Sequence, residues 1–275
     1  MNKVSCAKII DLALKEDIGS GDITASLIAP SSKSHAYIVS QQTAIICGAD
    51  FVTAVFAKID PKIKIIWLVQ DGDLVRAKQV LCKLYGPTRS LLTGERTALN
   101  FLQTLSSAAT LTHQFVGKIK GTKTKLLDTR KTLPGLRLAQ KYAVKCGGGQ
   151  NHRLGLYDAI LIKENHIAAC GSITNAVAKA RNLYPKKTVE VEVRDLKELR
   201  EALATSADII MLDNFTLKAI RAAVKINQGR VKLEVSGGVN LKNIRAFAKT
   251  RVDYISVGAI TKTVIPVELS MLFNA

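Results

Sequence analysis

From Lys123 onward, short apolar runs recur along the chain, and each is followed by a mixed segment long enough for a helix. The runs are rich in Val, Ile and Leu and do not alternate with polar residues, which is typical of parallel strands buried on both faces. Their spacing of roughly 20–35 residues is that of a strand plus its helix. The pattern therefore predicts strands at Thr124–Leu127, Asp158–Ile162, Thr188–Val193, Asp208–Leu212, Val231–Val235 and Tyr254–Val257.

A polar residue or a glycine ends each predicted strand. In a parallel barrel these ends share one face, and that face holds the active site. Polar residues can also simply mark where strands stop, but several different ionisable types at successive ends favour a site. Six strands are fewer than the eight of a full barrel, so an open, doubly wound sheet stays the structural alternative. The end positions are Asp128, Lys163, Glu192 or Arg194, Asp213, Ser236 and Gly258.

The first part of the chain has a different pattern. Apolar spacing predicts one amphipathic helix at Cys6–Glu16, and strand-like runs come after it, with turn signals at Asp71-Gly72 and Gly86-Pro87. Thr88–Lys120 lacks proline and is long enough for two helices, split near Ser106-Ser107. The strand-like runs are Ala36–Val39, Ala44–Cys47, Ile63–Val69 and Val80–Leu84.

These patterns predict an α/β fold with two domains. We expect an N-terminal α+β domain built on an antiparallel sheet over residues 1–107, with 265–275 packing back on it. We expect a C-terminal parallel α/β barrel, open or incomplete, over residues 108–264.

Length and composition narrow the class of protein. The 275 residues, 47% of them hydrophobic, are ordinary for a globular protein and exclude disorder. No apolar run approaches the ~18 residues of a membrane span, and Lys8 and Asp11 interrupt the N-terminal apolar pattern, so we expect no signal peptide. The five cysteines are scattered without a CxxC pair, which favours reduced thiols in the cytoplasm over a disulfide framework or a zinc site.

The net charge of +18 indicates anionic partners. Lysine and arginine are spread along the whole chain and aromatic residues are few, which disfavours a nucleic-acid module and favours phosphorylated or carboxylated small molecules. A charge this large exceeds what steering such substrates requires.

The segment from Leu126 to His166 is the densest in cationic residues. Arginine matches carboxylate or phosphate groups with two parallel hydrogen bonds, and cations that converge on one mouth repel each other unless an anion lies between them. By their places near strand ends we assign Arg130, Lys131, Arg153 and Lys163 to a site. We interpret Arg137, Lys141 and Lys145 as the solvated face of a surface helix.

Carboxylates stand inside or just after strands that are otherwise apolar. Glu190 and Glu192 point to the same side of one strand, and Asp213 closes the next. Such groups are costly without partners, so they are expected to bind Mg²⁺ or ribose hydroxyls, or to stabilise a developing cation. Structural salt bridges with the surplus cations are the alternative.

Two glycine turns come directly after consecutive strands. Ser236-Gly237-Gly238 and Gly258-Ala259 each precede a helix-like segment, an arrangement that can cradle a phosphate with backbone N–H groups. No Walker or GxGxxG motif is present, and no histidine has metal-ligand spacing with another histidine or a cysteine. His166 is expected to cap the segment after its strand.

Taken together, LLDTRKTLPGLRLAQKYAV, GGGQNHRLGLYDAILIKENHI, VEVEV, IIMLDNF, LEVSGGV and ISVGAIT, in this order, resemble the quinolinate phosphoribosyltransferase family. EDIGSGDIT and GERTALNFLQTLSSAAT match as well, so the resemblance covers essentially the whole chain. It implies transfer of phosphoribose from phosphoribosyl pyrophosphate to quinolinate with Mg²⁺. The products are nicotinate mononucleotide, pyrophosphate and CO₂, in de novo NAD synthesis.

The resemblance also implies roles for individual residues. Arg130, His152, Arg153 and Lys163 would hold the quinolinate carboxylates, and Arg96 would reach into the neighbouring subunit's site of a homodimer. Lys131, Glu192 and Asp213 would contact phosphoribosyl pyrophosphate, and the two acids would face its Mg²⁺. Lys131, Lys163, Glu192 and Asp213 are the expected catalytic residues. The expected phosphate cradle is Ser236, Gly237, Gly238, Gly258 and Ala259.

The sequence departs from the family at Lys262-Thr263, where a His-Ser pair is common, and neither residue receives a role. The alternatives are a nicotinate phosphoribosyltransferase, which needs no clamp for a second carboxylate, and a molybdate-transport-associated paralogue of the same fold. Apart from Mg²⁺, no cofactor is expected, because the pyridinium ring itself accepts the electrons released by decarboxylation. A Schiff base at Lys163 is disfavoured because the substrate has no ketone or aldehyde.

Overall fold

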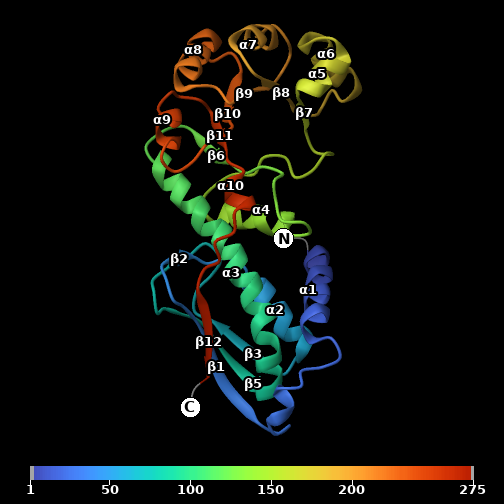
Figure 1. The fold of residues 1–275 in the computed structure, drawn as a ribbon, viewed down its shortest axis with the longest axis vertical. Coiled ribbons are helices and arrows are strands. Elements are labelled where there is room, and N and C mark those ends of the chain that lie inside the picture. Colours follow the sequence, from blue (N-terminus) through green and yellow to red (C-terminus); the bar gives the residue numbers. More distant parts are fainter. Residues whose placement is uncertain (1–2, 274–275) are drawn as a thin grey trace. The chain divides into compact units, whose positions relative to one another are not determined.

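The computed structural model describes residues 3–273, with side chains from residue 7 onward (Figure 1). Residues 1, 2, 274 and 275 of the predicted N-terminal domain, and the side chain of Cys6, lie outside these limits. The chain forms two compact units. Unit 1 comprises residues 1–113, 133–148 and 263–275, and unit 2 comprises residues 114–132 and 149–262. Residues 133–148, which the sequence pattern assigns to the barrel, are thus grouped with unit 1.

Unit 1 is built on an antiparallel sheet of four strands in the order β12-β1-β5-β3. Its strand β1 places Ile38 opposite Cys82 on one side and Met271 on the other, so both end regions of the chain contribute to one sheet. Strands β2 and β4, of two residues each, pair with each other in a separate small sheet. The strand bounds are β1 Lys33–Ser40, β2 Ala44–Ile45, β3 Lys64–Trp67, β4 Leu74–Val75, β5 Val80–Pro87 and β12 Leu269–Phe273.

Helices cover this sheet and supply the other half of its core. The core contains Phe51, Phe56 and Leu102, each almost fully buried. The sequence pattern did not lead us to predict α2, although its apolar residues recur at helical spacing. The helices are α1 Lys3–Ile18, α2 Ala49–Ile59, α3 Thr88–Ile119 and α4 Arg137–Cys146, with a short 3₁₀ turn at Ala25–Leu27.

The prediction of two helices in the segment after β5 is wrong, because α3 continues unbroken through Ser106-Ser107. The hydroxyl of Ser106 accepts a hydrogen bond from the backbone N–H of Cys47 at 3.0 Å. The serine thus bonds to a neighbouring segment and does not compete with the backbone of its own helix, which is how serine usually breaks one.

Unit 2 holds six parallel strands in the order β6-β11-β10-β9-β8-β7. All six predicted strands are confirmed. From β7 to β11 each strand pairs with the next one along the chain, and β11 then pairs with the first, β6. This single direction of winding is that of a barrel, whereas a doubly wound sheet reverses it. The strands are β6 Lys125–Leu127, β7 Ile160–Ile162, β8 Val189–Val193, β9 Ile209–Asp213, β10 Lys232–Ser236 and β11 Tyr254–Ser256.

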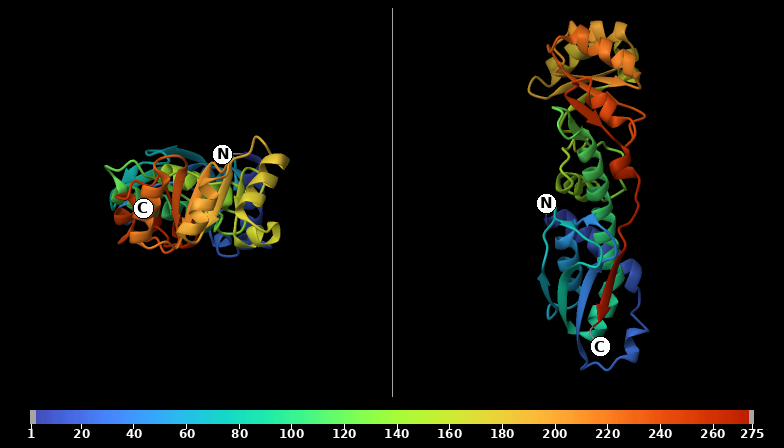
Figure 2. Two further views of the ribbon diagram at one scale, coloured as in Figure 1. Left: turned by 90° about the horizontal axis from the view of Figure 1, so that it is seen from above. Right: turned by 90° about the vertical axis from the view of Figure 1, so that its left-hand side faces the viewer.

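The barrel is incomplete between β6 and β7, where Leu127 instead bridges Gln150. Helices α6, α7 and α8 lie along the outer side of the strands (Figures 1 and 2). No helix in residues 3–273 is long and apolar enough to cross a bilayer. The helices of unit 2 are α5 Glu164–Cys170, α6 Ile173–Leu183, α7 Leu196–Leu203, α8 Leu217–Asn227, α9 Ile244–Ala248 and α10 Ala259–Lys262.

Candidate active site

The C-terminal ends of the barrel strands open into a cavity of about 360 Å³, formed entirely by unit 2. Cationic side chains and carboxylates from different strands share it, so the structure brings together residues that are far apart in sequence. The lining residues are Thr129, Arg130, Lys131, His152, Arg153, Leu161, Lys163, Glu192, Met211, Asp213, Glu234, Ser236 and Ser256.

The segment after β6 carries two of the predicted cations, Arg130 and Lys131. The backbone carbonyl of Lys131 accepts a hydrogen bond from the hydroxyl of Thr261 at 2.7 Å. The side chain of Lys131 passes close to Gly258, because a Cβ at that glycine would come within 3.1 Å of the lysine Cδ. A glycine at this strand end therefore leaves room for the lysine beside the predicted phosphate cradle.

The second predicted pair, His152 and Arg153, is held in place by the fully buried Asp128 at the end of β6. Its carboxylate accepts hydrogen bonds from the backbone N–H of His152 at 2.9 Å and from the Asn151 side chain at 2.6 Å. Burial, followed by the charge of Arg130, lowers the pKa of Arg153. Two guanidinium groups that repel each other inside a cavity indicate a place for an anion.

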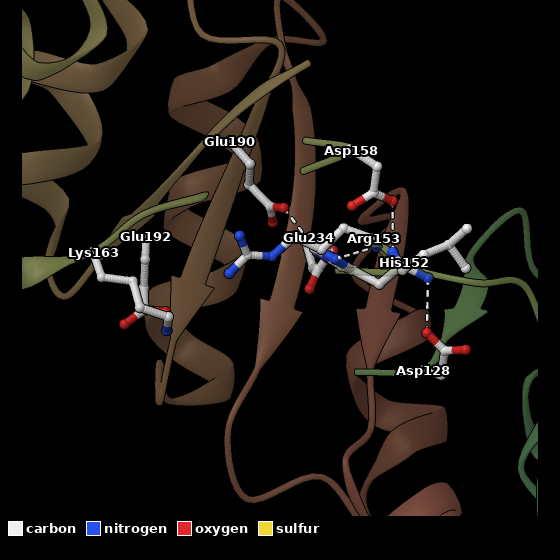
Figure 3. A network of polar contacts seen from close by, with 9 residues as sticks. Asp128, His152, Arg153, Asp158, Lys163, Glu190, Glu192 and Glu234 are labelled. Atoms are coloured by element: carbon white, nitrogen blue, oxygen red, sulfur yellow. Dashed lines mark hydrogen bonds and ion pairs between the residues drawn. The ribbon is translucent and has the colours of Figure 1, made fainter. Parts of the chain in front are cut away.

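Both ring nitrogens of His152 have partners within the chain (Figure 3). Nδ1 accepts a hydrogen bond from the backbone N–H of Arg153 at 2.8 Å. The proton of a neutral ring therefore lies on Nε2, which is 2.8 Å from a carboxylate oxygen of Glu190 and 3.6 Å from one of Glu234. The imidazole ring links the segment that carries Arg153 to the floor of the barrel.

Glu234 was not among the predicted site residues, because it lies inside a strand that reads as apolar. Its side chain is fully buried, and burial, followed by the charge of Glu190, raises the pKa of Glu234 to about 8. Neither carboxylate oxygen has a hydrogen-bond partner within standard distance and angle limits among the described residues. At neutral pH Glu234 thus holds its proton. The detectable signal in the sequence was a single glutamate among the valine and leucine of β10.

Lys163 and Glu192 form an ion pair across the strand ends of β7 and β8. Burial raises the pKa of Glu192, the Lys163 ammonium counteracts this, and Asp213 adds to the rise. Asp213 itself accepts a hydrogen bond from the Asn214 side chain at 2.8 Å. His166 caps α5 as expected, because its Nδ1 accepts the backbone N–H of Lys163 at 3.0 Å.

The glycine turns lead into shorter helices than the prediction implied. Gly237 and Gly238 have φ angles of +90° and +61°, and a Cβ at Gly237 would overlap the Asn214 side chain at 2.1 Å. The helices after the two turns, α9 and α10, have only five and four residues. Any phosphate binding here therefore depends on local backbone N–H groups and not on a long helix.

Arg96, which the family resemblance assigns to a neighbouring subunit's site, lies in unit 1 and does not line the cavity. The same holds for the three cations that we interpreted as a solvated helix face. Arg96 is exposed on α3, where burial raises the pKa of the adjacent Glu95 and the charge of Arg96 offsets part of that rise. Lys145 is exposed on α4 and Arg137 is partly exposed, but Lys141 is 1% exposed. The interpretation of Lys141 as a solvated residue is wrong, because its face of the amphipathic helix packs inward.

Glu192 and Asp213 are a donor set that suits Mg²⁺. They are carboxylates on the paired strands β8 and β9, and both line one cavity. Magnesium in proteins is commonly held by one or two carboxylates together with substrate phosphates. The residues present therefore fit the ion.

A parallel barrel whose mouth combines repelling guanidinium groups, a lysine beside glycine turns and a pair of carboxylates defines an enzyme that acts on anionic, phosphorylated small molecules. Comparison with known proteins narrows this class. Residues 22–106 match the family described as quinolinate phosphoribosyl transferase, N-terminal domain, and residues 108–272 match its C-terminal domain. The chain belongs to the quinolinate phosphoribosyltransferase family, and its relatives are pentosyltransferases.

Individual relatives cover nearly all of the chain. The probable nicotinate-nucleotide pyrophosphorylase (carboxylating) of Bacillus subtilis is 42% identical over 98% of this chain and 94% of its own. The corresponding protein of Mycobacterium leprae is 42% identical over 92% and 91%. The solved structure of the nicotinate-nucleotide pyrophosphorylase from Francisella tularensis has a TM-score of 0.98 and 50% identity, with 100% of this chain and 98% of that chain covered.

Proposed function

We propose that this protein transfers the phosphoribosyl group of phosphoribosyl pyrophosphate to the ring nitrogen of quinolinate, with loss of CO₂. The observation that carries the proposal is one cavity holding Arg130, Lys131, Arg153 and Lys163 together with Glu192 and Asp213. A dicarboxylate and a polyphosphate need such cations, and a developing ribosyl cation needs such acids. The names of the relatives agree with this reaction.

Quinolinate would lie between the two arginines, where its carboxylates relieve their repulsion. Because both ring nitrogens of His152 are already engaged, its proposed role is to position Arg153. Lys163 is paired with Glu192 before substrate binds. A quinolinate carboxylate that takes over Lys163 would release Glu192 toward the ribose, so binding of one substrate would prepare the site for the other.

The phosphoribosyl donor would lie across Lys131, Ser236 and the glycine turns. In the reaction the bond between C1 of ribose and the pyrophosphate oxygen breaks, and Glu192 and Asp213 stabilise the positive charge at C1. The pyridine nitrogen then forms the new bond to C1. Mg²⁺, held through Glu192 and Asp213, would neutralise the charge of the departing pyrophosphate.

Decarboxylation follows from the product of this step. The adjacent positive pyridinium nitrogen stabilises the electron pair left on ring carbon 2 when that carboxylate leaves as CO₂, and this pair then binds a proton from solvent. The arginines of the clamp orient this carboxylate, and no organic cofactor is required. The products are nicotinate mononucleotide, pyrophosphate and CO₂.

We also propose a homodimer in which Arg96 of each chain completes the site of the other. Its exposed place on α3 in unit 1, outside the cavity lining, is compatible with this role. The cysteines among residues 7–273 are free thiols, which accords with a cytoplasmic enzyme.

The test is a product assay on the full-length protein. The protein is incubated with Mg²⁺, phosphoribosyl pyrophosphate and either quinolinate or nicotinate, and mononucleotide and CO₂ are measured. Mononucleotide from quinolinate with an equal amount of CO₂ is expected. Product from nicotinate alone would refute the proposal and assign the protein to the non-carboxylating reaction. Product from neither would point to the molybdate-transport-associated paralogue.

A further inference from the structure

A second group of possible metal ligands lies in unit 1, whereas the cavity described above belongs to unit 2. The sulfur atoms of Cys47 and Cys146 and a carboxylate oxygen of Asp71 all lie within 4.8 Å of one another. They come from the segment after β2, the last residue of α4 and the turn between β3 and β4. We propose that these three side chains form a binding site for a thiophilic divalent cation, and Zn²⁺ fits the set best.

The sequence alone favours reduced, unliganded cysteines, because Cys47 and Cys146 are 99 positions apart and no CxxC pair exists. The fold overrides this expectation by bringing both thiols to one place. Zn²⁺ accepts cysteine sulfur and carboxylate oxygen in the same site, whereas Mg²⁺ and Ca²⁺ prefer oxygen alone. Two sulfurs and one oxygen therefore select a borderline-soft ion.

The backbone fixes two of the three ligands independently of any metal. The N–H of Cys47 donates to the Ser106 hydroxyl at 3.0 Å, and the cysteine side chain is fully buried. The carboxylate of Asp71 accepts the backbone N–H groups of Gly48 at 2.9 Å and Ala49 at 3.1 Å through one oxygen. That carboxylate can therefore face the sulfurs without losing its anchor at the start of α2.

The third ligand, Cys146, is fixed by its neighbour in sequence. A Cβ at Gly147 would come within 2.3 Å of the backbone carbonyl oxygen of Ala109, so the end of α4 packs directly on α3. A Cβ at Gly72 would lie 3.7 Å from the carbonyl of Cys146, which places the β3–β4 turn against the same helix end. Three ligands on such closely packed segments need only small movements to enclose an ion.

Further acidic groups lie close to the cluster. Asp50 and the phenol of Tyr142 both interact with the group. Gathering acidic groups in a partly buried place is costly unless a cation joins them.

The spacing suits tetrahedral coordination. Zn–S distances of about 2.3 Å and Zn–O distances of about 2.1 Å put ligand atoms roughly 3.3–3.8 Å apart, within reach of a separation below 4.8 Å. Cys146 and Asp71 are partly exposed, which gives an ion a way in. Each thiol that binds as a thiolate releases its proton to solvent. Three protein ligands leave a fourth position for water.

Tyr142 is the outer partner of the site, since its phenol interacts with both Asp71 and Cys146. A bound ion would tie α4 to the start of α2 and to the β3–β4 turn. In the sequence, α4 lies between the two cationic segments of the barrel unit, after Lys131 and before His152. The bound ion would therefore restrict the movement of the segment that connects them.

The experiment uses the full-length protein, freed of metal with a chelator under reducing conditions. Zn²⁺ alone is titrated in competition with a colorimetric chelator, Co²⁺ is used in parallel, and no enzyme substrate is present. We expect about one ion per chain, a cobalt–thiolate charge-transfer band, and a rise in Tm with Zn²⁺. Cys146→Ser should abolish the band and the shift, and Tyr142→Phe should weaken binding by about 10-fold.

Two variants distinguish this site from metal binding elsewhere on the chain and from a loss of folding. Cys170→Ser, which removes a partly exposed cysteine of unit 2, should leave binding unchanged. Asp71→Asn keeps an oxygen for the N–H groups of α2 and should still fold, but it should bind Zn²⁺ at least ~10-fold more weakly. Unchanged binding in Cys146→Ser, loss of binding in His152→Ala, absence of any binding, or formation of a Cys47–Cys146 disulfide in the presence of Zn²⁺ would each overturn the proposal.

Discussion

The buried carboxyl of Glu234 gives a quantitative prediction about stability. In Glu234→Gln the side chain keeps its size and stays neutral at every pH, so it imitates the protonated glutamate. The wild-type group has a pKa of about 8 in the folded chain against an ordinary value of 4.5. Between these values the folded chain holds a proton that the unfolded chain has released.

The sign follows from proton linkage. Because the pKa of an acid is raised by folding, its contribution is complete below about pH 4.5 and is lost as the pH rises through about 8. The full difference corresponds to roughly 5 kcal/mol, at ~1.4 kcal/mol per pH unit. The wild type should therefore lose stability relative to Glu234→Gln by up to about 4 kcal/mol between pH 5 and pH 8.

Urea unfolding at several pH values measures this difference. Far-ultraviolet circular dichroism follows both units, and the fluorescence of Trp67, the sole tryptophan, follows unit 1 separately. The difference between variant and wild type should grow with pH in the transition of unit 2 and stay flat for the exposed control Glu268→Gln. A flat difference for Glu234→Gln, or one that shrinks as pH rises, would show that no proton is held at this place.

Three further experiments test other parts of the structure. Arg153→Ala should raise the KM for quinolinate about 10- to 100-fold, because it leaves a substrate carboxylate half-paired. Alanine at an exposed arginine of α8 should leave the KM unchanged. Equal KM values for the two variants would disprove the role of Arg153 in binding quinolinate. Arg96→Ala and Lys163→Ala should each abolish turnover, and mixing them with subunit exchange should restore part of it; no recovery would argue against a shared site. Gly147→Ala should lower the free energy of unfolding by about 1–3 kcal/mol because its methyl group meets a backbone carbonyl of α3, whereas Gly117→Ala, with open space around it, should be neutral or stabilising; equal Tm values would contradict this packing.

The barrel could be predicted because its strands obey one simple rule. A strand buried on both faces reads as an uninterrupted apolar run, and its polar end points to the mouth. Arg130, Lys163 and Asp213 follow directly from that rule, and all line one cavity.

The polar contacts beneath the cavity could not be predicted from the sequence. The network of His152, Glu190 and Glu234 joins three segments whose register depends on the closing of the barrel, and no spacing along the chain encodes it. The unbroken course of α3 through Ser106 depends in the same way on a partner 59 positions away. Local propensity favoured a break there, and the tertiary contact outweighed it.

The pairing of β12 with β1 affects how the protein can be made. The sheet of unit 1 needs residues 269–273, which are synthesised after every other strand of that sheet, so β1 has an open edge until they are made. An edge strand with buried apolar residues such as Ile38 is a template for pairing with other chains. Until β12 emerges, the nascent chain is exposed to aggregation, and a deletion of residues 269–273 would make that exposure permanent.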